Sequence, residues 1–489
     1  MFGSKGTIAT GKIRFEKFHQ DSYALVNQKI GSLRGGNVFV GATWPFGMVQ
    51  VGPDTVGRPG DDYDGKTMGF DANHEDLMGV TANHLSGSSA ADLQDFLIVP
   101  FTSADPKEGE RKSQHIENVW DSPSPGAYRA VLERWAMFLD STASKRCAYH
   151  CFSYDRGGLV KVLVDAQSGA PGPNGADRVT FAESTFTTNG VFEGHNRVTC
   201  WKKDRDVYAK IAFSPTPVAI RELPANGKNG KRYIAEFNLG ANEKIYAKVA
   251  LSNQSMDGAR ANFAADGDDF DFDARKAAAE AEWRQVFARV ETDPEFDRNA
   301  QQRFYTAFYR TLVQPNLISD AGAADQYAMF AESDATRVMT PWHKIFVPSI
   351  VKATAAAKGV KGTYKGAIDV AKVPGSDLNE LCAKYFTNKS DGLCGNDEGG
   401  RLSAWYVFAC LGIYPTSEAG DTFAITTPQL NRIALTLENG KKFSVVAKGF
   451  SKDKRRVQSA TFNGKDVMGK TISYDEIMAG GELVFEMTK

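Results

Sequence analysis

The feature that most constrains this chain is a change in hydrophobic periodicity near residue 272. From about Asn37 to Leu251, short apolar runs rich in β-branched residues alternate with clusters of Gly, Pro, Asn and Asp. That pattern is typical of the strands of a β-sandwich. Beyond it, Trp283, Val286 and Phe287 recur at helical spacing in Ala-rich sequence. We therefore expect an α+β multidomain fold in which strands precede helices.

Three helices are predicted after this change. Asp273 is expected to be the N-cap of the first helix. A second helix is predicted from Glu295 to Gln314, where Pro315 stops it. A third runs from about Leu402 to Leu411 and is apolar nearly all round, so it should lie buried within a helical array.

Strands return after Pro415, separated by Asn-Gly and Gly-Gly turns; they are predicted over Arg432–Leu437, Phe443–Ala447 and Leu483–Met487. The stretch from about Asp320 to Leu378 has weak periodicity and receives no assignment. The predicted division is an N-terminal β-sandwich over residues 20–272, a helical domain over 273–420 and a C-terminal β segment over 421–489.

Composition narrows the classes of function. Lys plus Arg number 58 against 59 for Asp plus Glu, so there is no basic field for nucleic acid or an anionic membrane. No run of 18 apolar residues occurs, which predicts no transmembrane segment. The start lacks the apolar core of a signal peptide, which by sequence alone suggests a cytoplasmic location. The six cysteines form no CxxC pair, so buried free thiols are expected.

The densest polar constellation runs from Asp391 to Gly400 and leads directly into the third predicted helix. Its four glycines force a tight loop that brings Asn396, Asp397 and Glu398 to a helix N-terminus. The positive end of the helix dipole favours an ionised carboxylate, which suits a general base or a calcium ligand. Alternatively, one of the two acidic residues merely caps the helix.

A second constellation, Thr81 to Ser88 followed by Asp92 and Asp95, places His84 and Ser86 on a Gly-broken loop. These side chains are of the kind that bind sugar hydroxyls. A Ser86 nucleophile is the sharper alternative, but the chain lacks a G-x-S-x-G elbow.

A third segment, Arg34 to Gln50, is a Gly-rich start to a strand. No Gly-Lys-Ser/Thr follows, so it is not a phosphate loop. Trp44 lies within it, either to stack on a sugar ring or as a core residue.

Five stretches of the sequence resemble the calcium-dependent α-mannosidases of glycoside hydrolase family 92, and their order along the chain also matches. They are GGNVFVGATWPFGMVQVGPDT (Gly35–Thr55), NHLSGSSAADLQD (Asn83–Asp95), SPGAYRAVL (Ser124–Leu132), RFYTAFYRTLVQPNLISD (Arg303–Asp320) and DGLCGNDEGGRLSAWYVFACLGIYP (Asp391–Pro415).

The resemblance implies an N-terminal β-supersandwich packed on an (α/α)6 toroid, with the site between them. It implies an inverting glycosidase that acts on α-mannosides of N-glycans or mannans. Glu398 would be the base, with Asp397 as its partner or alternative. One Ca²⁺ would be held by Asn396, Asp397 and Glu398, and the glycan would be bound by His84, Ser86, Asp92 and Trp44. The family often has Asp at position 398. Its members are often secreted, so the resemblance leaves the location of this protein open.

The chain departs from the family pattern between Asp320 and Leu378, where the family has a longer helical region. We find neither its Trp-Asp-Thr segment nor the Trp-Glu segment that supplies the general acid. Glu332, Asp334 and Glu380 lie in or beside this region without the flanking motif, so the acid is assigned to no residue. The alternative to an active glycosidase is a catalytically impaired, sugar-binding relative.

One geometric expectation follows from these motifs. We expect the loop Asn396–Glu398 to lie at the start of a helix and to face the loop His84–Asp92 across a cleft, because binding pockets form preferentially between domains.

Overall fold

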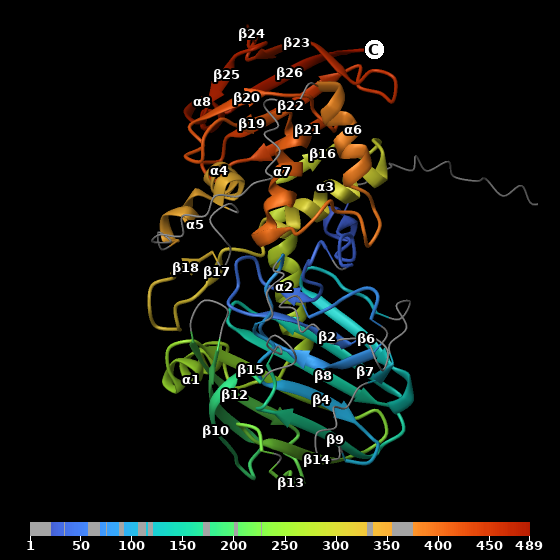
Figure 1. Ribbon diagram of the computed structural model, residues 1–489, viewed down its shortest axis with the longest axis vertical. Helices are drawn as coiled ribbons and strands as arrows, with labels where there is room; N and C mark the ends of the chain where they lie inside the picture. The colour runs from blue at the N-terminus through green and yellow to red at the C-terminus, as the bar shows by residue number, and fades with distance from the viewer. Residues whose placement is uncertain are drawn as a thin grey trace, which may run out of the picture.

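The computed structural model describes residues 21–33, 35–56, 69–74, 76–87, 92–105, 114–115, 121–169, 177–199, 204–225, 227–329, 336–354 and 375–489. Three layers follow one another along its long axis (Figure 1). The β-sandwich lies at one end, helices lie in the middle, and a smaller sheet with the C-terminus lies at the other end. The predicted order of strands, helices and strands is confirmed.

The sandwich consists of two antiparallel sheets. In spatial order, the first contains β1 (Ala42–Thr43), β2 (Gln50–Val56), β3 (Asp76–Thr81), β4 (Leu97–Phe101), β9 (Gly158–Asp165), β14 (Arg232–Leu239) and β13 (Ala219–Glu222), with β5 (Gln114–His115) on β3. The second contains β10 (Val179–Phe186), β11 (Val191–Val198), β12 (Arg205–Ser214), β15 (Lys244–Ser252), β8 (Cys147–Tyr154), β7 (Met137–Ala143) and β6 (Ala127–Leu132). Alternating side chains of both sheets form one apolar core between them.

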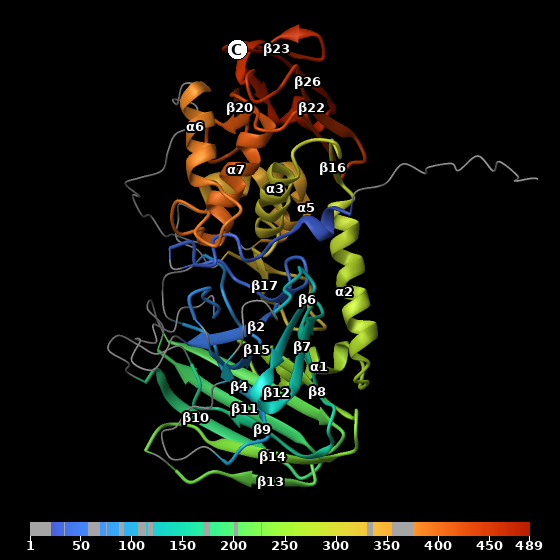
Figure 2. The ribbon, with the colours of Figure 1, turned by 90° about the vertical axis from the view of Figure 1, so that its right-hand side faces the viewer.

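Two helices leave the sandwich. Helix α1 (Met256–Ala265) lies on the second sheet, and α2 (Phe272–Phe287) runs along the side of the molecule to the helical layer (Figure 2). The predicted cap of α2 is wrong: Asp271, not Asp273, accepts the Ala274 N–H at 2.9 Å. Phe272 is buried and already helical, so the capping residue must precede it.

The helical layer contains α3 (Arg298–Arg310), α4 (Thr336–Phe346), α5 (Pro348–Ala353), α6 (Gly375–Tyr385) and α7 (Arg401–Leu411). As predicted, α7 is buried over nearly its whole surface, and it packs on α3 and α4. The predicted second helix is confirmed, but it spans Arg298–Arg310 instead of Glu295–Gln314. Asp297 caps its start by accepting the Asn299 N–H at 2.9 Å, and Thr311 is its C-cap. Within the described residues, no helix is long and apolar enough to cross a membrane.

The C-terminal layer has a mixed sheet and a small antiparallel sheet. The mixed sheet contains β16 (Val290–Thr292), β21 (Arg432–Thr436), β22 (Lys442–Lys448), β26 (Gly481–Thr488), β23 (Arg456–Phe462) and β24 (Lys465–Asp466). The small sheet contains β19 (Ile413–Pro415), β20 (Thr422–Ile425) and β25 (Thr471–Ser473), and α8 (Tyr474–Met478) follows β25. Strand β16 and the helices share one core with these sheets, so the predicted boundary at 420/421 falls within a single apolar core.

The cysteines in the described ranges are all free thiols. Cys147, Cys151, Cys382 and Cys410 are buried, whereas Cys394 is exposed in the loop before α7. Cys200 lies outside the described residues.

Candidate active site

The carboxylate loop, which we define as residues 396–400, leads into the start of helix α7. Gly399 and Gly400 both have left-handed backbone conformations, with φ of 58° and 90°. They turn the chain so that the Asp397 carboxylate accepts the Ser403 N–H at 2.9 Å and the Ser403 hydroxyl at 2.6 Å. Asp397 thus satisfies a free N–H group of the first turn of α7 and is completely buried.

Arg310, at the end of α3, interacts electrostatically with this buried carboxylate. Burial lowers the pKa of Arg310, and the negative charge of Asp397 opposes that effect. The guanidinium donates to the carbonyl groups of Gln28 and Ile30. Arg310 therefore holds the segment Gln28–Ile30 against the helical layer.

Glu398 and Asn396 differ from Asp397 because both side chains are only partly buried. Asn37 Nδ2 donates to Asn396 Oδ1 at 3.1 Å, and the Asp397 N–H donates to the Gly36 carbonyl at 3.1 Å. The carboxylate loop is thus bonded to the segment that leads into β1 of the sandwich.

The loop after β3, residues 82–87, contacts the carboxylate loop and is called the Gly87 loop below. The Gly87 N–H donates to the Asn37 carbonyl at 2.7 Å, and the Gly87 backbone touches Asp397. The structure thus brings together two polar loops, at Gly87 and Asp397, that lie more than 300 residues apart in the sequence. At Gly87 they are in direct contact.

His84 and Ser86 point into the protein. His84 is 1% exposed, with Nδ1 at 2.9 Å from the Gln50 carbonyl and Nε2 at 2.9 Å from Asp54 Oδ1. Ser86 Oγ accepts the Phe39 N–H at 3.1 Å. In this structure both side chains support the loop rather than line a surface.

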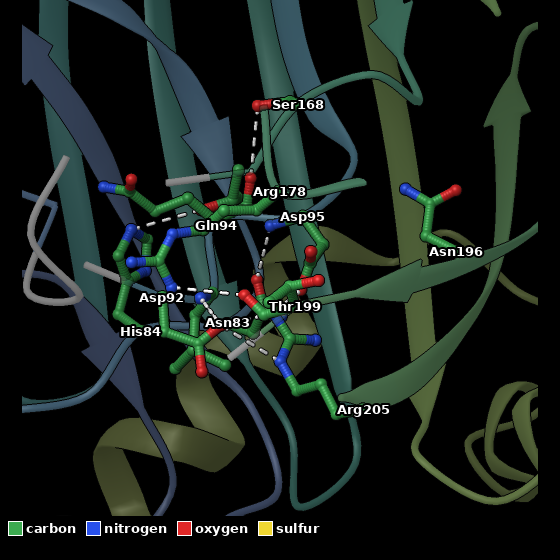
Figure 3. A network of polar contacts seen from close by, with 12 residues as sticks. Asn83, His84, Asp92, Gln94, Asp95, Ser168, Arg178, Asn196, Thr199 and Arg205 are labelled. Atoms are coloured by element: carbon green, nitrogen blue, oxygen red, sulfur yellow. Dashed lines mark hydrogen bonds and ion pairs between the residues drawn. The ribbon is translucent and has the colours of Figure 1, made fainter. Parts of the chain in front are cut away.

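Asp92 belongs to a polar network at one end of the sandwich (Figure 3). Arg205 donates to Asp92 Oδ1 at 3.0 Å and forms an ion pair with Asp95 at 2.7 Å. Asn83 donates to Asp95 Oδ2 at 2.6 Å and accepts the Asp95 N–H at 2.9 Å. Burial raises the pKa of Asp95, and the charge of Arg205 opposes the rise. Asp92 and Asp95 thereby anchor Asn83, the neighbour of His84.

Trp44 is partly buried in a turn where the sandwich meets the end of α3. Its carbonyl accepts the Gly47 N–H at 2.8 Å, while the Phe46 N–H donates to the Leu312 carbonyl at 2.9 Å. Trp44 therefore lies where the β-sandwich meets the helical layer, and the residue keeps some exposed surface.

Comparison with known families divides the chain into two family domains, the β-sandwich and the helical and C-terminal layers together. The profile of the glycosyl hydrolase family 92 N-terminal domain matches residues 25–252, and that of the family 92 catalytic domain matches residues 258–359 and 375–489. The chain belongs to glycosyl hydrolase family 92. The catalytic-domain match comes in two pieces, in agreement with a family 92 domain that is shortened in its middle.

Solved structures with this fold include other members of family 92. An α-mannosidase of the family from Bacteroides thetaiotaomicron has a TM-score of 0.83 at 18% identity, over 96% of this chain and 94% of that one. An inverting mannosidase of the family from the same bacterium has a TM-score of 0.78 at 15% identity, over 96% and 97%. At these identities the likeness establishes the fold.

A curated relative is an uncharacterized secreted glycosidase from Arthroderma benhamiae. It is 23% identical over 334 residues, which are 61% of this chain and 42% of the relative. The match therefore spans less than half of that relative's length.

Sequence reasoning about this family 92 site missed Ser403, Arg310 and Asp54. Ser403 had a local signal, since it lies three residues after Gly400 in the first turn of a helix whose leading loop contains an aspartate. Arg310 and Asp54 had none, because their partners come from distant parts of the chain.

The structure assigns the general acid to none of the three carboxylates considered from the sequence. Glu332 and Asp334 lie outside the described residues. Glu380 is exposed on α6, which contacts the C-terminal layer through the Asn379–Arg455 hydrogen bond of 2.9 Å. The small opening beside the carboxylate loop is lined by Arg303, Arg310, Ser403 and Tyr406, among others, and its lining has no carboxylate.

The three predicted calcium ligands do not form a cation site in this arrangement. Both Asp397 oxygens are taken up by Ser403, which leaves the side-chain oxygens of Asn396 and Glu398. In the part of the chain that the structure describes, no group of three or more His, Cys, Asp or Glu residues could hold a metal ion. Ca²⁺ takes six to eight oxygen ligands, which is more than the side chains of Asn396 and Glu398 supply.

Proposed function

We propose that this chain binds α-mannosidic glycans at the junction of the β-sandwich and the helical layer. We propose further that it acts on them as an inverting glycosidase with Glu398 as the general base. The observation that carries the proposal is the contact between the carboxylate loop and the Gly87 loop. It supports a site shared by both family 92 domains, as expected of a ligand site at a domain interface.

Glu398 is the better candidate for the base because its side chain is partly exposed, while Asp397 is buried and bonded to Ser403. Glu398 lies next to the N-terminus of α7, whose free N–H groups favour the ionised carboxylate that a base requires. An inverting enzyme uses this carboxylate to activate a water molecule opposite the leaving group. Asp397 would act by fixing the loop.

A second candidate function is sugar binding without efficient hydrolysis. It is favoured by the absent Trp-Glu segment and by the lack of a carboxylate in the lining of the neighbouring opening. General acid catalysis contributes typically about 10²–10⁴-fold. Its loss should affect a poor leaving group most, since a nitrophenolate departs without a proton.

The deciding experiment compares hydrolysis of a mannobiose and of a nitrophenyl α-mannoside by this chain and by Glu398→Gln. We expect slow aryl mannoside hydrolysis that Glu398→Gln abolishes, and little mannobiose hydrolysis. Glu380→Gln, on the exposed face of α6, is the matched control and should leave both rates unchanged.

An unchanged aryl mannoside rate in Glu398→Gln would remove Glu398 as the base. Efficient mannobiose hydrolysis would show that another carboxylate supplies the proton. Mannoside binding by calorimetry without turnover of either substrate would establish the second candidate function.

A further inference from the structure

His84 and Asp54 form a closed pair beneath the Gly87 loop. Their side chains are 0% and 1% exposed, and they approach within 2.9 Å through His84 Nε2 and Asp54 Oδ1. The imidazole also contacts the Gln50 carbonyl, 2.9 Å from Nδ1, and the Thr81 hydroxyl, 3.1 Å from Nε2. The Phe39 ring lies 5.5 Å from it.

The hydrogen-bond partners fix how many protons the pair holds. A backbone carbonyl only accepts, so His84 Nδ1 must carry hydrogen. A carboxylate also only accepts, so the contact of 2.9 Å requires a proton either on Nε2 or on Asp54. A neutral imidazole facing an ionised Asp54 would oppose two lone pairs. The pair therefore carries no net charge, whichever atom holds the second proton.

The surroundings of the His84–Asp54 pair also favour a pair without net charge. Asp71 and His74, in the segment before β3, contact the Thr55 hydroxyl through a backbone N–H and a ring nitrogen. Asp397 and Glu398 lie against the Gly87 backbone. Asp54 Oδ2 is buried and has no hydrogen-bond partner among the described residues. A lone charge here would be uncompensated and costly.

The pair is connected to the candidate active site through short contacts. Ser86, two residues after His84, accepts the Phe39 N–H, and Gly87 donates to the Asn37 carbonyl. Asn37 in turn donates to Asn396 of the carboxylate loop. A displacement of the His84 ring would therefore move the loop that touches Asp397.

We propose that Asp54 and His84 share a proton as a charge-neutral buried pair that positions the Gly87 loop against the carboxylate loop. His84 is then a positioning residue and does not bind the sugar. This assignment stands independently of the glycosidase proposal, because it concerns a proton and a backbone contact of the free protein.

The first test is NMR of the whole chain with ¹⁵N-labelled histidine, with His84→Gln used to assign the signal. At pH 8 a free histidine is neutral. We expect His84 to show either two protonated ring nitrogens or, with Asp54 protonated, a Nδ1–H ring hydrogen-bonded at Nε2; the ¹³C carboxyl shift of Asp54 separates the two. An ionised Asp54 beside a neutral ring in the native protein would overturn the proposal without any variant.

The second test is hydrogen exchange at the Gly87 amide. Asp54→Asn removes the shared proton but retains a hydrogen-bonding side chain, and we expect the Gly87 amide to exchange faster by about tenfold or more. Asp206→Asn is the control, because it disrupts the His195–Asp206 contact of 2.8 Å on the outer face of the same domain. Unchanged exchange in Asp54→Asn, or an equal increase in both variants, would contradict the positioning role.

Discussion

Gly87 and Asp397 touch through their backbones. A Cβ atom on residue 87 would lie 1.8 Å from the Asp397 carbonyl oxygen and 2.7 Å from the Glu398 Cα. The glycine also has a φ of +76°, which L side chains rarely adopt. The junction of the two family 92 domains therefore depends on the absence of a side chain at this position.

Gly87→Ala should destabilise the chain and separate the two loops. We expect a loss of about 2–4 kcal/mol in the free energy of unfolding, from overpacking and backbone strain together. Gly464→Ala is the matched control: Gly464 has a φ of +79° but nothing within 4 Å of its virtual Cβ, so only the strain remains. Equal losses in the two variants, measured by urea denaturation, would show that the contact contributes nothing.

Ser403→Ala should weaken the start of helix α7. It removes the hydroxyl that donates to Asp397 at 2.6 Å and leaves a buried carboxylate oxygen unsatisfied. The expected loss is about 1–3 kcal/mol, observed as a lower Tm. Ser403→Thr keeps a hydroxyl and should retain most of the stability. If Ser403→Ala melts like the parent chain, Asp397 is not holding the helix.

Stability should fall between pH 7 and pH 5 because of His343. Burial lowers the pKa of His343 to about 4, while a donated hydrogen bond to the Thr311 carbonyl opposes the shift. Between its unfolded value of 6.5 and about 4, only the unfolded chain binds this proton, so the folded state loses stability as the pH falls. The loss is about 2 kcal/mol at pH 5.

His343→Phe removes this titration. The difference in unfolding free energy between the parent chain and His343→Phe, measured by urea denaturation at both pH values, should shrink by about 2 kcal/mol from pH 7 to pH 5. A constant difference would mean that His343 is protonated in the folded protein.

Removal of calcium should change the free protein only slightly. Asn396 and Glu398 offer three side-chain oxygens, one of which already accepts a hydrogen bond from Asn37, so we expect an affinity in the range of about 10⁻⁴–10⁻³ M. At about 1 mM Ca²⁺ this corresponds to no more than about 1.5 kcal/mol of stabilisation. Calorimetric titration and melting with and without chelator check this expectation, and a submicromolar affinity would show that further ligands complete the site.

Sequence patterns predicted the helices and strands correctly where the hydrophobic periodicity agrees with the Gly or Pro residues at the ends of the element. Helix α7 was predicted within one residue, since it is apolar all round and bounded by Gly400 and Gly412. The helices α4 and α5 were missed because Pro341 interrupts the local signal. They are held by packing instead: Trp342 is completely buried and donates to the Thr311 hydroxyl at 2.8 Å.

The sequence by itself determined which loops carry the polar residues and that glycines shape them. Only the tertiary structure decided the orientation of each side chain: His84, Ser86, Asp92 and Asp397 are buried, while Asn396 and Glu398 keep exposed surface. The physical reason is that burial and hydrogen bonding depend on partners brought from far along the chain. The contact of Gly87 with Asp397 is one of these, and spacing within a single motif carries no information about it.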